Sequence, residues 1–500
     1  MTRSAEDVAA LSGWRADWAG LRVAVLGLGV TGFSVADTLS ELGADLLVLS
    51  STADPVTTDL LDVIGVRHFT TDLAEHLDGF GPELVVVSPG FRPSHPLVLR
   101  ARERGVPVWG DVELAWRLRD KLEPAADWIA ITGTNGKTTT TQLTSAMLAA
   151  GGQRVVACGN VGVPVLDAIR DPTGFDVLVV ELSSFQLHYL DSMSPFSAAC
   201  LNLADDHIDW HGSAAEYRLA KGRVYQRTKV ACVYNLEDVA TRELVEQADV
   251  VEGCRAIGFG LGLPGPSDVG LVNEILVDRA FLDDRQRSAL EIATVSDLEV
   301  VGLGSPHMIA NVLAAAALAR SFGVSTAAIR AAIMAFRLDP HRTETIQEAG
   351  GVRWVDDSKA TNPHAAQAAI DSFTSIVWIV GGLFKGVDVD DLVSRNVAKL
   401  RAAVVIGVDR KPLVEAFTRH APELPVFEVD TTETDQVMSA AVRLSASVAV
   451  IGDTVLLAPA AASMDQFADY ADRGNRFVTA VHDLLGGPDD DEHSPTPAAS

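Results

Sequence analysis

A glycine-rich segment carrying a lysine and three threonines has the residue types needed to bind phosphate. Gly133-Thr-Asn-Gly-Lys-Thr-Thr139 follows the apolar run Trp128–Thr132, typical of a buried parallel strand, and precedes a helix expected to run through about Ala150. Glycines let backbone N–H groups face a phosphate, and the helix N-terminus adds partial positive charge. Lys137 adds a full charge, and Thr138 can place its hydroxyl on Mg²⁺. The segment predicts a nucleotide-binding loop.

This loop is shorter than the full Walker pattern, which asks for a glycine five residues before Gly136, where this chain has Ile131. The alternative interpretation is a tight turn followed by a surface lysine. Against it, Thr138–Thr141 is a run of four β-branched residues that start a helix poorly, so hydroxyls with a binding role explain the run better. We predict that the loop binds ATP through Gly133, Thr134, Asn135, Gly136, Lys137, Thr138 and Thr139.

Acidic groups and a histidine follow the phosphate loop. Val177–Val180 predicts a buried strand with Glu181 at its end, and the later segment Asn202–Asp209 includes the pair Asp206-His207. A carboxylate at the carboxyl edge of a parallel strand, beside a phosphate loop, is well placed for Mg²⁺. Taken singly, the aspartates are better explained as helix caps, and His207 as a hydrogen-bonded core or surface histidine. Taken with Glu181, they favour a metal site.

A second glycine-rich turn, Gly27-Leu-Gly-Val-Thr-Gly32, follows the strand expected at Arg22–Leu26 and fits G-x-G-x-x-G. A dinucleotide site needs an acidic residue at the end of the second strand to hold the ribose. The second strand, Asp45–Leu49, ends instead in Ser50-Ser51. The sequence therefore disfavours NAD. A pyrophosphate without nicotinamide still fits this turn, and a plain strand–helix packing turn is the alternative.

The order strand, glycine-rich turn, helix starts afresh three times, at Arg22–Leu26, Trp128–Thr132 and Ile376–Val380. This pattern predicts an α/β fold with three domains, each a mostly parallel sheet wound by helices, the first and last Rossmann-like and the central one a P-loop domain. The chain of 500 residues has room for about three domains of roughly 150 residues. We expect Gly260–Asp268 to be a loop. The predicted boundaries give domains at 1–122, 123–338 and 339–486, with a disordered charged tail at 487–500.

Composition excludes several classes of partner. The net charge of −27 repels a nucleic-acid backbone, and aromatic residues make up only 6%. The four cysteines form no C-x-x-C pair, and we expect them to be small buried side chains in a reducing compartment rather than disulfides or zinc ligands. Neither a signal peptide nor an apolar run of about 18 residues is present, so we expect a cytoplasmic protein without membrane insertion.

Together these motifs carry a family resemblance that extends from about Leu21 to Leu484. Four segments resemble the Mur ligases, the amide-forming enzymes of peptidoglycan synthesis: Thr132–Thr138, Gly159-Asn-Val-Gly162, Glu181-Leu-Ser-Ser-Phe-Gln186 and Asp206-His207. Four segments resemble, more specifically, the members of that family that add D-glutamate to UDP-N-acetylmuramoyl-L-alanine. They are Glu181–Leu187, Asp357-Ser-Lys-Ala-Thr-Asn362, Ser463–Phe467 and Arg473-Gly-Asn-Arg-Phe477. The resemblance also implies a role in cell shape and cell division, which depend on the cell wall.

The resemblance implies that the first domain holds the UDP part, the second ATP with two Mg²⁺, and the third the amino acid. It implies that Lys137 neutralises the β- and γ-phosphates, and that the metal ligands are Thr138, Glu181, His207 and Lys221. Lys221 matches a lysine that the family carbamylates with CO₂, although from sequence alone it is a solvated helix lysine. The implied catalytic set is Lys137, Glu181, His207 and Lys221, in a protein we expect to be a monomer.

Further positions take implied binding roles from the same resemblance. Asn311, Arg342 and Asp357 match ATP-binding positions. The implied substrate-binding positions are Val30, Thr31, Ser51, Asn160, Ser183, Gln186, Lys359, Thr361, Lys385, Ser463 and Tyr470. The chain departs from the usual family residues at Ser50-Ser51 (usually Asp-Thr), Met308 (Asn), Tyr470 (Phe) and Ala458 (Ser).

The implied reaction begins when the L-alanyl carboxylate attacks the γ-phosphate of ATP and forms an acyl phosphate, which the amine of D-glutamate then attacks. Alternatives of the same chemistry are another Mur ligase or a folylpolyglutamate synthase. A P-loop NTPase of another class, an NAD oxidoreductase and a non-catalytic homologue are further alternatives. The phosphate loop alone does not separate these from the ligase.

Overall fold

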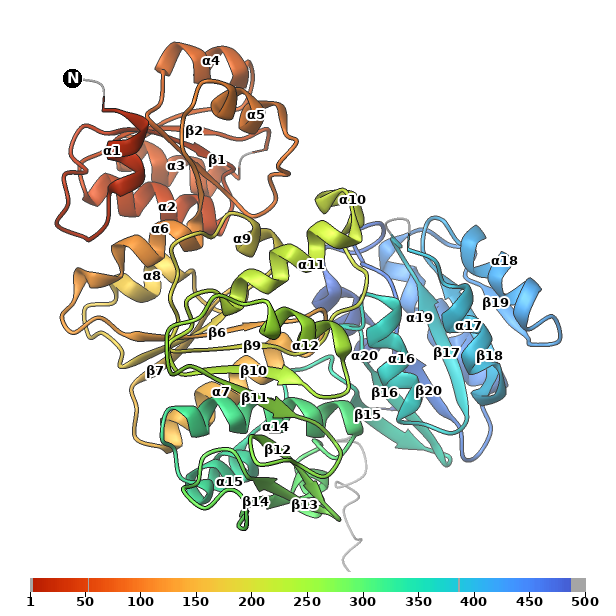
Figure 1. Cartoon of the computed structure of the whole chain (residues 1–500). Helices are drawn as coiled ribbons and strands as arrows, with labels where there is room; N and C mark the ends of the chain where they lie inside the picture. Colours follow the sequence, from red (N-terminus) through yellow and green to blue (C-terminus); the bar gives the residue numbers. More distant parts are fainter. Residues whose placement is uncertain (1–2, 53, 385–386, 487–500) are drawn as a thin grey trace, which may run out of the picture. The chain divides into compact units, whose positions relative to one another are not determined.

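The computed structural model describes residues 3–52, 54–384 and 387–486, which form two compact units. The first unit ends at Phe336 and the second begins at Arg337. Both are α/β, with parallel strands covered by helices (Figure 1), so the predicted fold class is confirmed. The predicted tail at 487–500 and Lys385 lie outside the described residues. Among the helices that are described, none is long and apolar enough to cross a membrane.

The first sheet of the first unit is parallel and has the strand order β3-β2-β1-β4-β5. Its strands are β1 (Arg22–Leu26), β2 (Asp45–Leu49), β3 (Arg67–Phe69), β4 (Leu84–Val87) and β5 (Val108–Gly110). The helices are α1 (Ala5–Ala10), α2 (Val30–Glu41), α3 (Pro55–Val63), α4 (Leu73–Phe80), α5 (Pro96–Glu103), α6 (Asp111–Leu118) and the 3₁₀ turn η1 (Arg119–Lys121).

The turn between β1 and α2 is tight. Gly27 has φ +100°, and a Cβ on Gly32 would lie 2.0 Å from the carbonyl oxygen of Gly27. Both positions therefore require glycine, because the helix starts in direct contact with the strand end. The predicted strands at Arg22–Leu26 and Asp45–Leu49 are confirmed.

The second sheet has nine strands in the order β14-β13-β12-β11-β10-β9-β6-β8-β7. The run β7 to β12 is parallel, whereas β12, β13 and β14 pair antiparallel. The strands are β6 (Asp127–Thr132), β7 (Val155–Gly159), β8 (Val177–Glu181), β9 (Ser197–Cys200), β10 (Ala231–Asn235), β11 (Arg255–Phe259), β12 (Asp268–Val272), β13 (Ile275–Asp278) and β14 (Leu290–Thr294). The expected loop at Gly260–Asp268 is confirmed up to Ser267, since Asp268 opens β12.

Helices cover both faces of this sheet, with α7 and α14 packed together on one face and α11 on the other (Figure 1). The helices are α7 (Lys137–Ala150), α8 (Val165–Arg170), α9 (Ser184–His188), α10 (Ile208–His211), α11 (Ala214–Gly222), η2 (Arg223–Tyr225), α12 (Val239–Glu246), α13 (Val295–Val300), α14 (Pro306–Ser321) and α15 (Thr326–Ala335). Strands β6 and β8 contain the continuous apolar runs Trp128–Ile131 and Val177–Val180, and every residue of these runs is buried, as expected for strands covered on both faces.

The second unit has a six-stranded sheet in the order β15-β16-β20-β17-β18-β19, parallel except for the β15–β16 pair. The strands are β15 (Glu344–Ala349), β16 (Val352–Asp356), β17 (Ile376–Gly381), β18 (Leu400–Ile406), β19 (Val426–Glu428) and β20 (Thr454–Leu457). The helices are α16 (Pro363–Asp371), α17 (Asp390–Asn396), η3 (Val397–Lys399), α18 (Lys411–His420), α19 (Thr434–Val448) and α20 (Tyr470–Leu485).

Candidate active site

The phosphate loop connects β6 to the 14-residue helix α7. Gly133 has φ +154°, and Gly136, the N-cap of the helix, has φ +79°. A Cβ on Gly136 would lie only 2.4 Å from Oδ1 of Asn311, which reaches the loop from α14. Glycine is thus needed for both conformation and space. The turn presents its backbone and a helix N-terminus to one spot, as phosphate binding requires.

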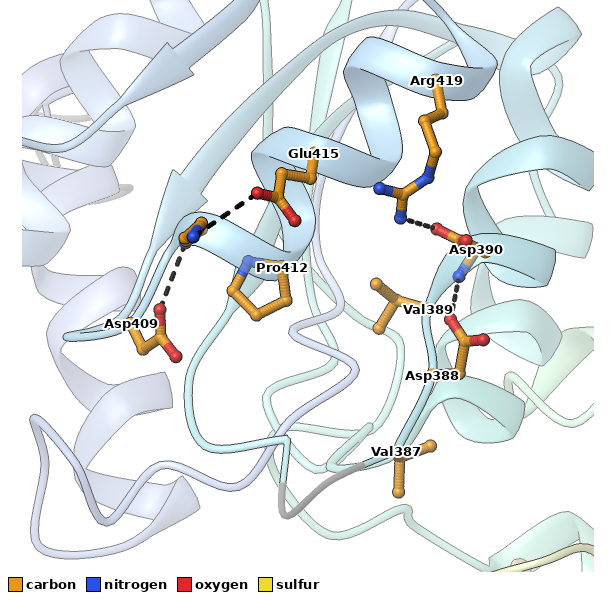
Figure 2. A pocket seen from close by; sticks show the side chains of 9 residues that line it. Val387, Asp388, Val389, Asp390, Asp409, Pro412, Glu415 and Arg419 are labelled. Atoms are coloured by element: carbon orange, nitrogen blue, oxygen red, sulfur yellow. Dashed lines mark hydrogen bonds and ion pairs between the residues drawn. The ribbon is translucent and has the colours of Figure 1, made fainter.

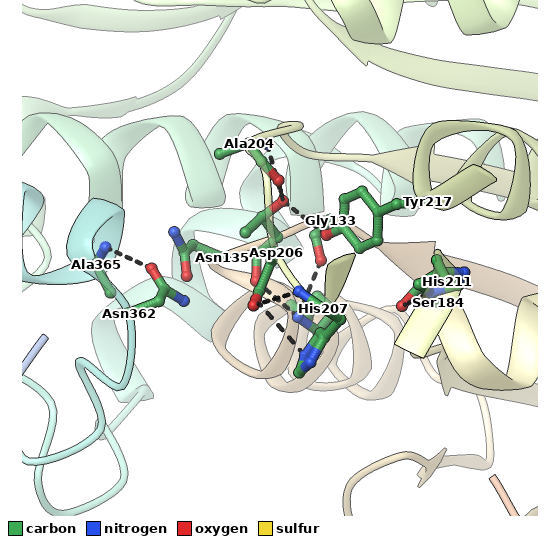
Figure 3. Close-up of polar contacts among 12 residues, drawn as sticks. Gly133, Asn135, Ser184, Ala204, Asp206, His207, His211, Tyr217, Asn362 and Ala365 are labelled. Atoms are coloured by element: carbon green, nitrogen blue, oxygen red, sulfur yellow. Dashed lines mark hydrogen bonds and ion pairs between the residues drawn. The ribbon is translucent and has the colours of Figure 1, made fainter. Parts of the chain in front are cut away.

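The side chain of Asn202, which follows β9, forms two hydrogen bonds with the backbone of the phosphate loop. Oδ1 of Asn202 accepts the N–H of Asn135 at 2.8 Å, and its Nδ2 donates to the carbonyl oxygen of Asn135 at 3.1 Å. The hydroxyl of Thr134 lies 2.9 Å from that of Tyr217 on α11 (Figure 3). Sequence reasoning assigned no role to Asn202 or Tyr217. In the sequence, Asn202 is recognisable only as a polar residue after a strand, and Tyr217 only as an aromatic residue four positions before Lys221.

Two lysines meet at this loop. Nζ of Lys137 donates to the carbonyl oxygens of Gly133 at 2.9 Å and Thr134 at 2.8 Å. Nζ of Lys221 donates to the same Gly133 carbonyl at 2.8 Å and to Oγ1 of Thr132 at 2.9 Å. Lys221 is only 2% exposed, so the interpretation of a solvated helix lysine is wrong. Helix α11 points it at the sheet edge.

This burial changes the chemistry of the Lys221 amine. Burial, together with the positive charge of Lys137, lowers the pKa of Lys221 well below its usual range. A neutral amine carries the lone pair that attacks CO₂, whereas an ammonium ion does not. The lowered pKa of Lys221 thus favours the neutral amine, the form that reacts with CO₂.

Glu181 lies at the carboxyl end of β8, level with Ile131 of β6 and Gly159 of β7. Its side chain is 1% exposed, and its Oε1 accepts Nδ2 of Asn160 at 2.8 Å. Within the described part of the chain, its Oε2 is buried without a hydrogen-bond partner. An orphaned buried carboxylate oxygen is costly, and a cation is the partner that would satisfy it best.

The donor set fits Mg²⁺ bound together with phosphate. In residues 3–52, 54–384 and 387–486, no three His, Cys, Asp or Glu side chains gather into a metal cage. Mg²⁺ does not need one, because it commonly takes one or two carboxylates and completes its shell with water and substrate phosphates. Thr138 is buried in the first turn of α7, and the buried hydroxyls of Thr139, Thr140 and Thr141 have no partner among the described residues.

His207 occupies an irregular position. Its φ is +52°. Its Nε2 lies 3.6 Å from Oδ2 of Asp206 (Figure 3). Its ring packs edge-on against that of Phe185, with the ring centres 4.7 Å apart. A left-handed backbone at a histidine is uncommon and costs energy, which is typical of functional sites.

The segment after Glu181 forms an ordered cap. Ser183 is the N-cap of α9, and the hydroxyl of Ser183 and the side chain of Gln186 form a reciprocal capping box. Nε2 of Gln186 donates to Oδ2 of Asp111 at 3.2 Å, and burial raises the pKa of Asp111 to about 6. Nε2 of His211 lies 3.0 Å from the hydroxyl of Ser184 (Figure 3). The sequence did not single out Asp111 or His211.

The first glycine turn leaves its helix start open. Val30, the first residue of α2, is 76% exposed, and Thr31 beside it is half-buried. Ser51 is exposed, whereas Ser50 is buried and donates its hydroxyl to the carbonyl oxygen of Thr52. Solvent therefore reaches Val30, Thr31 and Ser51. The Ser50 hydroxyl instead forms a hydrogen bond within its own turn.

In the second unit, the predicted residues follow two neighbouring parallel strands. Lys359 and Thr361 come after β16, and Ser463 comes after β20, which pairs with β16 in parallel. Nζ of Lys359 donates to the hydroxyl of Tyr470 at 2.8 Å and lies 4.3 Å from the centre of its ring. Ser463 is buried. The strand order thus brings a cation and hydroxyls to one sheet edge.

Arg473 joins these two segments from α20. It is fully buried, its Nη2 donates to the carbonyl oxygen of Ser358 at 2.8 Å, and its Nη1 donates to that of Ala461 at 3.1 Å. Burial lowers the pKa of Arg473 to about 10. The sequence marked the motif around Arg473 without giving it this positioning role.

In this unit, hydrogen bonds fix the two neighbours of the predicted ATP-binding residue Arg342. Nδ1 of His341 lies 2.7 Å from Oδ2 of buried Asp356, which raises the pKa of His341. The N–H of Thr343 donates to Oδ1 of Asp357 at 3.2 Å, and burial raises the pKa of Asp357 to about 7. Arg342 lies between these two anchored residues.

A separate cleft of about 300 Å³ lies between the starts of α17 and α18 (Figure 2). Its charged groups bind one another: Arg419 donates to Asp390 at 2.5 Å, and Lys411 lies 3.7 Å from Glu415. None of the predicted site residues in the described chain lines it.

The comparisons with known proteins agree with the motifs. The Mur ligase MurD-like N-terminal domain matches residues 21–110, the Mur ligase middle domain residues 131–319, and the Mur ligase glutamate ligase domain residues 341–461. A protein of Leifsonia xyli subsp. xyli named UDP-N-acetylmuramoylalanine--D-glutamate ligase is 61% identical over 509 residues, covering 99% of this chain and 98% of its own. The chain belongs to the Mur ligase family.

Further relatives within the Mur ligases agree. A protein of the same name from Streptomyces avermitilis is 51% identical, covering 94% of this chain and 99% of its own. The solved UDP-N-acetylmuramate-alanine ligase of Thermotoga maritima is 19% identical with a TM-score of 0.54, covering 93% of this chain and 100% of its own. That likeness shows the shared fold. Membership of this ATP-dependent ligase family implies ATP and Mg²⁺.

Proposed function

We propose that this Mur ligase adds D-glutamate to UDP-N-acetylmuramoyl-L-alanine at the expense of ATP. The observation that carries the proposal is the clustering of a glycine phosphate loop, the buried amine of Lys221 and the half-satisfied carboxylate of Glu181 at one sheet edge. The choice of substrates is supported by the names of relatives that are 61% and 51% identical over nearly the whole chain.

ATP provides the activation that a free carboxylate lacks. A carboxylate resists attack by an amine because it is resonance-stabilised and negatively charged. Transfer of the γ-phosphoryl group from ATP to the L-alanyl carboxylate gives an acyl phosphate, whose phosphate then leaves as the D-glutamate nitrogen attacks. The protein mainly positions reactants and offsets charge.

The phosphate loop performs the positioning for ATP in this proposal. The backbone from Gly133 to Thr139 holds the phosphates, and Lys137 exchanges its carbonyl partners for phosphate oxygens. Asn311, packed against Gly136, closes one side of the loop. Arg342 and Asp357 are further proposed ATP-binding residues, from their match to ATP-binding positions of the family.

Two Mg²⁺ ions are proposed, with Thr138, Glu181, His207 and carbamylated Lys221 as the protein ligands. When bound, Mg²⁺ offsets the negative charge that develops on the transferred phosphoryl group. The carbamate converts the neutral amine of Lys221 into a carboxylate-like group, R–NH₂ + CO₂ giving R–NH–COO⁻ and H⁺. Its support is the burial and lowered pKa of Lys221.

The remaining proposed contacts divide by substrate. Val30, Thr31, Ser51, Asn160, Ser183 and Gln186 bind the nucleotide–muramoyl substrate, and Lys359, Thr361, Lys385, Ser463 and Tyr470 bind D-glutamate. Local cations are needed because the whole protein carries a charge of −27 and D-glutamate has two carboxylates. We further propose a cytoplasmic monomer with domains at 1–122, 123–338 and 339–486.

Phosphate release in a panel of acceptors tests the proposed function. With ATP, Mg²⁺ and UDP-N-acetylmuramoyl-L-alanine, we expect release that depends on D-glutamate. Turnover with L-lysine or diaminopimelate but not D-glutamate would assign another Mur ligase. Turnover with a folate substrate and glutamate would assign a folylpolyglutamate synthase, and release without any acceptor would indicate a simple ATPase.

A further inference from the structure

Two of the four cysteines lie next to each other in the central sheet. Cys232 is on β10, and Cys254 directly precedes β11, the neighbouring parallel strand. Their Sγ atoms are 3.7 Å apart. Both are thiols, and neither belongs to the proposed active site.

The strand register explains this closeness. Cys232 is paired with Ala256, so Cys254 is two residues before the register partner of Cys232. Side chains two residues apart point to the same face of a sheet, which makes Cys232 and Cys254 diagonal neighbours on one face. The N–H of Arg255 donates to the carbonyl oxygen of Val230 at 3.0 Å and fixes the start of β11 in this register.

The two thiols differ in exposure and in the direction in which their pKa values are shifted. Cys232 is buried at 1% exposure, while Cys254 is half-buried and packs at the margin of the same core. The sulfur atoms of Cys232 and Cys254 are within hydrogen-bond distance of each other, and this contact lowers the pKa of Cys254. Cys254 is therefore the thiol that a dissolved oxidant reaches first, and it is the one more readily present as thiolate.

We propose that Cys232 and Cys254 are an oxidisable dithiol that closes to a disulfide between β10 and β11. With hydrogen peroxide as oxidant, the thiolate of Cys254 takes one peroxide oxygen, and with a proton the other leaves as water. The sulfur of the resulting sulfenic acid is then attacked by Cys232, whose S–H proton leaves with the hydroxide as a second water. Two thiols and one peroxide give one disulfide and two waters, and a dithiol reductant reverses the change.

The other two cysteines provide an internal comparison. Cys158 on β7 and Cys200 on β9 are fully buried, and burial raises the pKa of each to about 12. Neither is exposed or activated, so both should stay reduced. The expectation of small buried side chains holds for Cys158, Cys200 and Cys232, whereas Cys254 is half-buried.

The experiment treats the purified full chain at low concentration with hydrogen peroxide or diamide. Free thiols are counted after unfolding, and peptides are mapped without reduction. We expect the count to fall from four to two, the intact mass to drop by two hydrogens, and one linked peptide pair to contain Cys232 and Cys254. The oxidised protein should also unfold at a higher temperature, because the bond closes a loop between residues 22 positions apart.

Two variants and one control complete the test. Cys254→Ala and Cys232→Ala should each keep three free thiols after diamide treatment and show no oxidation-dependent rise in unfolding temperature. Cys158→Ala should still form the bond. Four remaining thiols in the oxidised wild type, a bond to Cys158 or Cys200, or a bond only between chains would overturn the proposal. Cys254→Ala keeps the test decisive if the buried Cys232 variant fails to fold.

Discussion

Lys137 and Lys221 donate to the same acceptor, the carbonyl oxygen of Gly133, at 2.9 and 2.8 Å. Two ammonium groups this close repel each other, and the deeper one also loses hydration. The buried member, Lys221, therefore has its pKa lowered. The lowered pKa favours the neutral amine of Lys221, the form that can take up CO₂.

The first prediction concerns Lys221. Lys221→Ala should lower the rate of phosphate release by about 10²-fold or more, because a proposed metal ligand is lost. A short carboxylic acid such as acetate, or high bicarbonate with a small amine, should restore part of the rate. With ¹³C-bicarbonate, the wild type should show a carbamate carbon signal by NMR that the variant lacks.

Lys229 supplies the control for that experiment. It is a half-exposed surface lysine 3.8 Å from Asp127, and Lys229→Ala should keep both the rate and the carbamate signal. Full activity of Lys221→Ala in bicarbonate-free buffer would contradict the proposed role.

The second prediction concerns Glu181. Glu181→Gln keeps the size of the side chain and an oxygen that can accept from Asn160. It removes the negative charge of the carboxylate, whose Oε2 has no hydrogen-bond partner in the described chain. The Mg²⁺ concentration for half-maximal rate should rise by about 10-fold or more. Titration of the rate with Mg²⁺ measures it. The exposed Glu243→Gln on α12 is the matched control, and equal Mg²⁺ dependence in both variants would argue against Glu181 as a ligand.

The third prediction separates backbone strain from loss of space at the phosphate loop. Gly136 and Gly152 both have positive φ, at +79° and +90°, but a Cβ on Gly136 would strike Asn311 while one on Gly152 would meet nothing within 4 Å. Alanine at either position should cost about 1–2 kcal/mol of unfolding free energy. Only Gly136→Ala should also raise the KM for ATP. Similar KM values in the two variants would show that the contact is unimportant.

The fourth prediction concerns Tyr470, whose hydroxyl accepts Nζ of Lys359. Tyr470→Phe removes this neutral partner and leaves the ammonium over the ring. We expect the KM for D-glutamate to rise several-fold, by about 0.5–1.5 kcal/mol in binding free energy, because the hydroxyl that holds Lys359 and is proposed to bind D-glutamate is lost. Lys359→Ala should raise the same KM. An unchanged or lower KM in Tyr470→Phe would argue against a role of the hydroxyl in binding D-glutamate.

The fifth prediction is a pH dependence of stability in the second unit. The hydrogen bond to Asp356 raises the pKa of His341 above its ordinary 6.5, so protonated His341 stabilises the fold. This contribution is complete below the unfolded pKa and is lost as pH rises through the folded one. The difference in unfolding free energy between wild type and His341→Gln should therefore be larger at pH 6 than at pH 9.

Chemical denaturation at both pH values measures this difference. The exposed His364→Gln should show the same difference from wild type at pH 6 and pH 9. A difference for His341→Gln that grows with pH would mean that the neutral ring is the stabilising form.

Much of the fold was readable from the sequence because its signals are local. The strand at Val177–Val180 and the helix from Lys137 to Ala150 each lie within one continuous segment, and the structure has them at β8 and α7. The antiparallel strands β13 and β14 were not predicted, since their pairing depends on partners rather than on a strong pattern of their own.

By itself the sequence determined the residue types of the candidate site: the phosphate loop, Glu181, and the lysine, arginine and hydroxyl groups of the last motifs. Tertiary structure decided how deeply these residues are buried and which groups they contact. Lys221 has an ordinary helical sequence around it, and only packing of α11 over the sheet edge buries its amine against Gly133. Asn202 reaches Asn135 across 67 positions of sequence, and Asp111 reaches Gln186 across 75. Such contacts depend on which strands become neighbours, so no local pattern specifies them.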